Sequence, residues 1–150
     1  MPRPHIPNIL RRLVTERASA CCEYCLIPQI VGADMHHLDH LIALKHGGAT
    51  VESNLALACI DCNQCKGSDL AAIDPVERVV VPLFNPRTQR WCDHFQLVGP
   101  RIVGLTPVGR ATIALLRLND EARLIDRQML MEARRYPPLH MQETSQTGSE

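Results

Sequence analysis

Two pairs of cysteines in the sequence have the spacing of metal ligands. Cys22 and Cys25 form one C-x-x-C pair, and Cys59 and Cys62 form a second. Each pair can turn two thiolates toward one point, and two pairs complete a tetrahedral zinc site. Four unrelated buried thiols are the competing explanation, which the paired spacing disfavours. We therefore predict that these four cysteines bind one structural Zn²⁺ ion, which would contribute directly to folding.

The other three of the seven cysteines are not assigned to the metal. Cys21 stands beside a predicted ligand, and Cys65 adds a third x-x-C step after Cys62, so the assignment of both as non-ligands rests on the pairing alone. Cys92 is isolated and is predicted to be a small core residue. A redox role for either pair is disfavoured, because no βαβ pattern surrounds them.

The 33 residues between the two pairs carry a second group of chemically capable side chains. The stretch MHHLDHLIALKHGG, residues 35–48, places three histidines and Asp39 in its first six positions and ends in a double glycine. His40 has a side chain that can accept a proton near neutral pH. Asp39 supplies a hard carboxylate oxygen suited to Mg²⁺. This stretch can therefore supply both a base and a ligand for a metal ion.

The order of these residues resembles that of a known family. Asp39-His40, Gly47-Gly48 and Asn54-Leu55 are followed by Cys59-x-x-Cys62-Asn63-x-x-Lys66-Gly67. Over roughly residues 22 to 68 this pattern is similar to the HNH endonuclease family, whose shared unit is the ββα-metal (His-Me) finger. The later stretch PLFNPR…W…HF…IVGLT…GRAT resembles the C-terminal part of a group of bacterial HNH proteins.

The resemblance implies a role for each matched position. It makes His40 the general base, Asp39 a ligand of a catalytic divalent ion, and Asn54 the residue that braces the loop after His40. Asn63 stands where the family usually has its last histidine and would be the second ligand through its amide oxygen. That departure favours Mg²⁺ or Mn²⁺ over softer ions, because oxygen ligands suit harder cations.

Further residues are expected to contact nucleic acid. Lys66 is expected to contact a phosphate. His37 is a candidate because it shares a strand face with Asp39. The alternative is that His36 and His37 are ordinary strand residues. His46 is predicted to be a loop residue. In the C-terminal part, Arg87, Arg90 and Arg110 are expected on phosphates. Arginine supplies 14 of the 16 basic residues and suits bidentate phosphate contacts.

Local patterns predict the elements that position these residues. An amphipathic helix over 8–19 is expected to begin at Asn8, with strands at MHHLD, VERVVVPLF and PRIVGLT. Thr106 and Pro107 are expected to start one helix. Another, over about 120–135, carries Ala122, Ile125, Met129 and Ala133 on one apolar stripe. A short helix is expected to end at Gly67.

These elements predict an α+β protein. We expect residues 1–70 to form a ββα-metal core with an N-terminal helix, held together by the four-cysteine zinc site. Residues 71–138 are expected to form an α/β extension of strand and two helices that packs on the core. Residues 139–150 are polar and are expected to form a disordered tail.

The expected function is metal-dependent hydrolysis of DNA phosphodiester bonds, with double-stranded DNA as partner. The alternative is a zinc-stapled nucleic-acid-binding module without catalytic activity. A formal net charge of zero argues neither for nor against nucleic acid. No apolar run is long enough to span a membrane. The absence of a signal-peptide pattern predicts a cytoplasmic protein, in which unpaired cysteines are expected.

Overall fold

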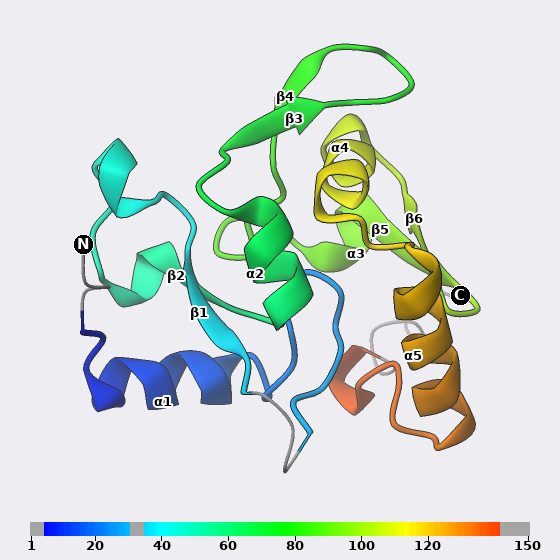
Figure 1. Ribbon diagram of the computed structural model, residues 1–150, viewed down its shortest axis with the longest axis horizontal. Coiled ribbons are helices and arrows are strands. Elements are labelled where there is room, and N and C mark those ends of the chain that lie inside the picture. Colours follow the sequence, from blue (N-terminus) through cyan, green and yellow to red (C-terminus); the bar gives the residue numbers. More distant parts are fainter. Residues whose placement is uncertain (1–4, 31–34, 142–150) are drawn as a thin grey trace, which may run out of the picture.

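The computed structural model describes residues 5–30 and 35–141 and shows a mixed α/β fold built on short elements (Figure 1). The first half consists of α1 (Asn8–Arg17), β1 (His37–His40), the 3-10 turns η1 (Leu44–His46) and η2 (Glu52–Asn54), β2 (Leu55–Ala58) and α2 (Ile60–Lys66). The second half consists of β3 (Ala71–Ile73), β4 (Val80–Pro82), α3 (Trp91–His94), β5 (Phe95–Val98), β6 (Arg101–Gly104), α4 (Pro107–Leu116) and α5 (Glu121–Glu132).

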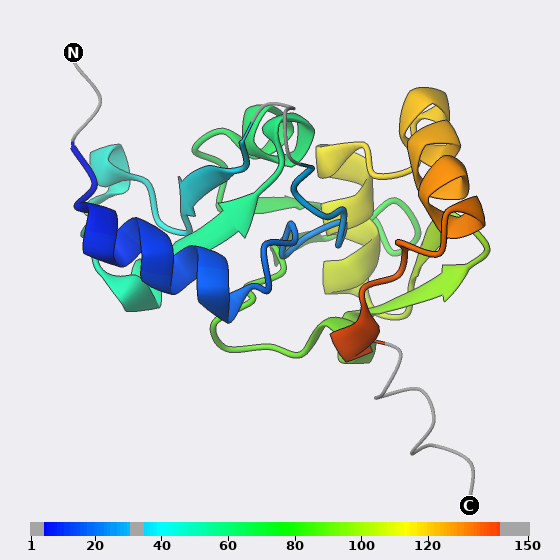
Figure 2. The ribbon, with the colours of Figure 1, turned by 90° about the horizontal axis from the view of Figure 1, so that it is seen from below.

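The first half is a two-stranded hairpin between two helices. β1 and β2 pair antiparallel, with Asp39 opposite Ala56 and His40 opposite Leu55. Helix α1 packs against β2, and α2 contacts both strands (Figures 1 and 2). All four side chains of β2 are buried. The stretch LALA therefore lacks the alternation that identifies a half-buried strand, which explains why local pattern alone did not place it.

The predicted end of α2 agrees with the structure, but the predicted cap of α1 does not. Helix α1 begins at Asn8, but Pro7 occupies the capping position and no side chain caps the helix, so the predicted role of Asn8 as a cap is wrong. Helix α2 ends at Gly67, as predicted, with φ of 52°. Its first turn is capped by the Cys59 sulfur, which accepts a bond from the backbone N–H of Cys62.

The second half contains two hairpins, where the sequence pattern had indicated single strands. β3 pairs with β4, and β5 pairs with β6, both antiparallel. The expected strands at VERVVVPLF and PRIVGLT thus shorten to β4 and β6 and acquire partners. Both expected helices are present, and Thr106 caps α4 by accepting a bond from the Gly109 N–H at 3.0 Å.

The predicted inward face of α5 is wrong. Ile125 and Met129, from the expected apolar stripe, are 52% and 63% exposed, whereas the side chains of Arg123 and Arg127 are buried. Arg127 donates to the backbone oxygen of Pro100 at 2.6 Å and to Asn119 at 3.1 Å. Buried guanidinium groups are tolerated only where acceptors surround them, and periodicity cannot reveal acceptors contributed by distant segments.

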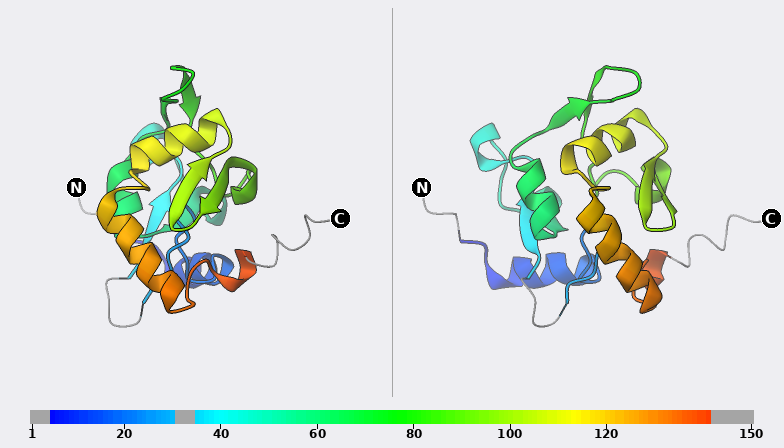
Figure 3. Two further views of the ribbon diagram at one scale, coloured as in Figure 1. Left: turned by 90° about the vertical axis from the view of Figure 1, so that its right-hand side faces the viewer. Right: turned by 45° about the vertical axis from the view of Figure 1, so that its right-hand side comes forward.

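One core cluster joins the two halves. It includes Tyr24 and Ala58 from the first half and Phe84, Phe95 and Leu116 from the second. Helix α2 packs on α4, and the views from two further sides show the second half lying beside the hairpin (Figure 3).

Two directional bonds cross the same boundary. The indole N–H of Trp91 donates to the backbone oxygen of Tyr24, and the Tyr136 hydroxyl donates to that of Cys25, both at 2.8 Å. Within residues 5–30 and 35–141, none of the helices combines the length and apolar character that crossing a bilayer requires. Of the expected tail, residues 142–150 lie outside the described residues.

Candidate active site and cysteine cluster

The four cysteines of the two C-x-x-C pairs meet in the core. Cys22, Cys25, Cys59 and Cys62 are all buried, and their sulfur atoms lie within 4.8 Å of one another. The Cys25 and Cys59 sulfurs are 3.7 Å apart. One pair lies in the turn after α1 and the other at the start of α2, so the cluster joins segments that are far apart in the chain.

The chemistry of this cluster fits a dication. Burial raises the pKa of the Cys22 and Cys62 thiols, because a buried thiolate loses its hydration. Hydrogen bonds from the neighbouring thiols lower the pKa of Cys25. Four closely placed sulfurs cannot all ionise in the core without a compensating cation, and four thiolates are a common ligand set for structural zinc.

The remaining cysteines lie outside the cluster, as predicted. The buried thiol of Cys21 lies 3.4 Å from the backbone oxygen of Ser19, and Cys65 is half-buried against the core. Cys92 is exposed on α3, so its predicted place in the core is wrong. A single small residue on a four-residue helix gives no periodic signal for its facing.

A polar pocket of about 560 Å³ opens at the end of β1. It is bounded by β1, by the loop after β1, by α2 and, on one side, by α1. The side chains that could do chemistry there are those of His37, Asp39, His40 and Asn63, with Arg11 and Ser68 on the same lining. The structure thus brings together the predicted base and the two predicted ligands.

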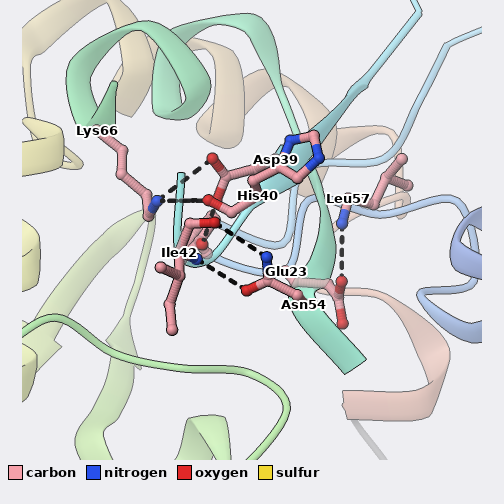
Figure 4. A network of polar contacts seen from close by, with 8 residues as sticks. Glu23, Asp39, His40, Ile42, Asn54, Leu57 and Lys66 are labelled. Carbon is pink, nitrogen blue, oxygen red and sulfur yellow. Dashed lines mark hydrogen bonds and ion pairs between the residues drawn. The ribbon is translucent and has the colours of Figure 1, made fainter. Parts of the chain in front are cut away.

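Asp39 is the buried member of this group. Its carboxylate, 4% exposed, accepts a bond from the Tyr24 hydroxyl at 2.8 Å. It also pairs with the Lys66 ammonium at 3.2 Å (Figure 4). Burial raises the pKa of Asp39, and Lys66 and Tyr24 oppose that change. Each carboxylate oxygen has two lone pairs, so these two partners leave acceptor capacity that can face the pocket.

The structure corrects the expectation for Lys66. Its side chain is 3% exposed and reaches inward from α2, where the ammonium also donates to the backbone oxygen of His40 at 3.2 Å (Figure 4). An ammonium held by Asp39 and a strand carbonyl is not available to a phosphate in solvent. Lys66 instead fixes the positions of Asp39 and of the backbone of His40.

His40 lies half-buried at the end of β1. Its Nε2 atom is 2.9 Å from the Thr50 hydroxyl, and no described contact involves its Nδ1 atom. The side chains of His37 and Asn63 also line the pocket and form no hydrogen bond within the described part of the chain. One ring nitrogen of His40 is therefore oriented by a partner, while the other has no hydrogen-bond partner within the described residues.

Asn54 closes the loop that follows His40. Its amide oxygen accepts from the Ile42 N–H at 2.9 Å, and its amide nitrogen donates to the backbone oxygens of Ile42 at 2.9 Å and of Ala49 at 2.8 Å (Figure 4). A Cβ atom at Gly48 would lie 1.7 Å from the Ile42 oxygen and 2.9 Å from the Asn54 nitrogen. Only glycine permits this close approach, which accounts for the second glycine of the pair.

Two of the three C-terminal arginines are already paired. Arg87 forms an ion pair with Glu23, both nearly buried, and Arg110 holds Asp74 through two bonds of 2.8 and 2.9 Å. Bonds from Arg110 keep the pKa of Asp74 below its usual range. Arg87 is therefore held inside the fold by its partner, whereas Arg110, a quarter exposed, binds Asp74 through two of its nitrogens. Arg90 is exposed.

Sequence reasoning missed several residues of these sites. Tyr24 lies between Cys22 and Cys25. This position was a usable signal, because a residue inside a ligand pair must lie close to the metal site. Thr50 and Arg123 gave no local signal, since each meets its partner through tertiary packing.

One of the comparisons with known proteins gave a match. Residues 22–69 match the family described as HNH endonuclease, which confirms the resemblance drawn from the motif. Neither the curated proteins nor the solved structures gave a match to the chain.

Proposed function

We propose that this chain, whose residues 22–69 match the HNH endonucleases, is a metal-dependent endonuclease that hydrolyses DNA phosphodiester bonds. The observation that carries the proposal is the shared pocket of Asp39, His40 and Asn63. A protein that only binds nucleic acid has no need of a base beside two oxygen ligands. In this proposal β1, β2 and α2 form the ββα-metal unit, residues 1–70 are the nuclease core and 71–138 its extension.

His40 is the general base of the proposed reaction. If Nε2–H donates to the Thr50 hydroxyl, Nδ1 carries the lone pair and takes the proton of the attacking water. A partner on one ring nitrogen fixes the ring orientation, and the Thr50 hydroxyl can accept from Nε2–H in this tautomer. Asn54 supports this geometry by fixing the backbone at Ile42, two residues beyond the base in the sequence.

Asp39 and Asn63 are the residues that would bind the catalytic ion. One carboxylate and one amide oxygen suit Mg²⁺ or Mn²⁺, which keep several waters among their ligands. When bound, such an ion polarises the phosphate and stabilises charge on the leaving oxygen. Tyr24 and Lys66 hold the Asp39 carboxylate in one orientation, as partners of metal ligands commonly do.

Phosphate contacts are assigned to the cations that the fold leaves free. Arg11 is exposed on α1 and lines the pocket, so it can meet the strand that enters there. Arg90 is one of the exposed cations of the extension, and His37 lies on the pocket wall beside Asp39. This assignment moves the main contact surface from the extension toward α1.

The four-cysteine cluster is proposed to bind structural Zn²⁺, and the cytoplasm is the proposed compartment. All seven cysteines are described as free thiols, which suits a reducing environment.

The proposal is tested by incubating supercoiled plasmid with purified protein and Mg²⁺ or Mn²⁺. Conversion to nicked or linear DNA that EDTA abolishes supports it, and a His40→Ala preparation controls for contaminating nuclease. The alternative is a silent zinc-stapled binding module. Retarded migration of DNA with no cleavage by either ion would favour that alternative and overturn the endonuclease.

A further inference from the structure

The buried face of α5 meets the cysteine cluster. Arg123 is 9% exposed, and its Nη2 atom lies 2.9 Å from the Cys62 sulfur and 3.8 Å from the Cys59 sulfur. Its other terminal nitrogen donates to the backbone oxygen of Leu116 at 2.7 Å. The guanidinium group thus bridges the end of α4 and the sulfurs at the start of α2.

Simple packing does not account for a charge at this position. An unpaired guanidinium in the core is costly, and backbone carbonyl oxygens alone do not neutralise it. Among the hydrogen-bond partners of Arg123 within the described residues, the two sulfurs are the acceptors that can carry a full negative charge. With a dication bound, four thiolates leave the cluster with a net negative charge, so a buried cation beside them is electrostatically matched.

We infer that Arg123 is a positioning residue of the metal site, which donates to the Cys62 thiolate and couples metal binding to the docking of α5. The extension is then part of the zinc site and more than an appendage to it. This inference rests on the metal assignment of the four cysteines and is independent of nuclease activity.

A neighbouring residue shows what a purely structural arginine does in the same helix. Arg127, one turn along α5, is 1% exposed and bonds to Pro100 and Asn119, and it makes no bond to sulfur within the described residues. Replacing it should loosen α5 as much as replacing Arg123 does, but it removes no hydrogen bond to a thiolate and changes only a longer-range charge interaction with Cys25 and Cys62. Arg127 is therefore the matched control.

The experiment compares the full-length parent with Arg123→Met and Arg127→Met. Zinc affinity is measured by competition with a chromophoric chelator, and the Co²⁺-substituted proteins are examined for their sulfur-to-cobalt charge-transfer band. We expect Arg123→Met to weaken zinc binding about 10- to 100-fold, the range for lost partners of metal ligands. Its band should move to longer wavelength, because a thiolate that loses a hydrogen bond and a nearby cation gives up an electron more easily.

Arg127→Met should lower thermal stability while its Co²⁺ band moves much less than that of Arg123→Met. If Arg123→Met fails to fold, Arg123→Lys is compared with Arg127→Lys, and the expected result is a smaller band shift confined to Arg123→Lys. Coincident bands in parent and both variants of a folded pair would overturn the inference. A parent that binds neither Zn²⁺ nor Co²⁺ would overturn the metal assignment itself, whatever the nicking assay shows.

Discussion

The cysteine cluster and the polar pocket share helix α2 but are built in opposite ways. Cys59 and Cys62, at the start of α2, are buried with their sulfurs directed at one another. Asn63, the next residue, lines an open pocket with His40, and its amide makes no hydrogen bond within the described part of the chain. One turn of helix therefore contributes to a closed site and to an open one.

The difference between the two sites indicates that one is suited to a structural role and the other to a chemical one. A closed ligand set leaves no position for substrate and suits a structural ion, whereas a site that performs chemistry must keep positions open to water and substrate. The closed site fixes the start of α2, and α2 then sets the direction of Asn63 and Lys66. Loss of the cysteine cluster should therefore destroy both sites, while changes in the pocket should leave the cysteine cluster intact.

The largest effect is expected from Cys59→Ser. This change removes one ligand, while the serine hydroxyl can still cap α2, so the protein should lose its metal and its cooperative fold because metal-binding energy is folding energy here. Elemental analysis and circular dichroism measure the two losses. The matched control is Cys65→Ser on the same helix, which should retain one zinc per chain. A folded Cys59→Ser protein with full zinc content would contradict the closed-site assignment.

The next effect is expected from His40→Ala. Loss of a general base should lower the cleavage rate by about 10²- to 10⁴-fold. Thermal stability, zinc content and DNA affinity should stay near those of the parent, because the base acts in the transition state. Single-turnover nicking rates and gel-shift titrations measure these quantities. Cleavage at the parental rate would show that another residue is the base.

A third comparison separates support from coordination within the open site. Asn54→Ala should lower the turnover number by about 100-fold, since a loosened loop misplaces the base, and added Mn²⁺ should not restore it. Asn63→Ala removes a ligand oxygen, so raising Mn²⁺ should recover part of its activity. Nicking rates are measured across a Mn²⁺ titration, with Asn54→Asp as the variant that keeps size but loses the donors. Rescue of Asn54→Ala but not of Asn63→Ala would mean that the two roles are exchanged.

The smallest effect is expected at the arginines. Arg11→Ala should weaken DNA binding a few-fold and lower the slope of log affinity against log salt by about 1, because one phosphate contact is lost. Arg87→Ala should leave that slope unchanged and reduce stability by about 3 kcal/mol, because Glu23 loses its nearly buried partner. Salt-dependent anisotropy and thermal unfolding distinguish the two. If Arg87→Ala lowered the salt slope and Arg11→Ala did not, the DNA contact surface would lie on the extension and not on α1.

Part of the protein was determined by the sequence alone. The two C-x-x-C pairs predicted the cluster, and the order of Asp39, His40, Asn54 and Asn63 predicted which side chains would share a site. Thr106 with Pro107 predicted the start of α4, and Gly67 the end of α2. These features were readable because each depends on residues close in sequence or on a ligand spacing that few other functions require.

Only the tertiary structure decided which charged groups are free. Lys66, Arg87, Arg110 and Arg123 look alike in the sequence as candidates for phosphate, yet each is directed inward by an acceptor from a distant segment: Asp39, Glu23, Asp74 and the Cys62 sulfur, respectively. A cation is buried only where an acceptor compensates its lost hydration, and the acceptor's position is set by packing. For the same reason α5 turns its arginines inward and its apolar stripe toward solvent.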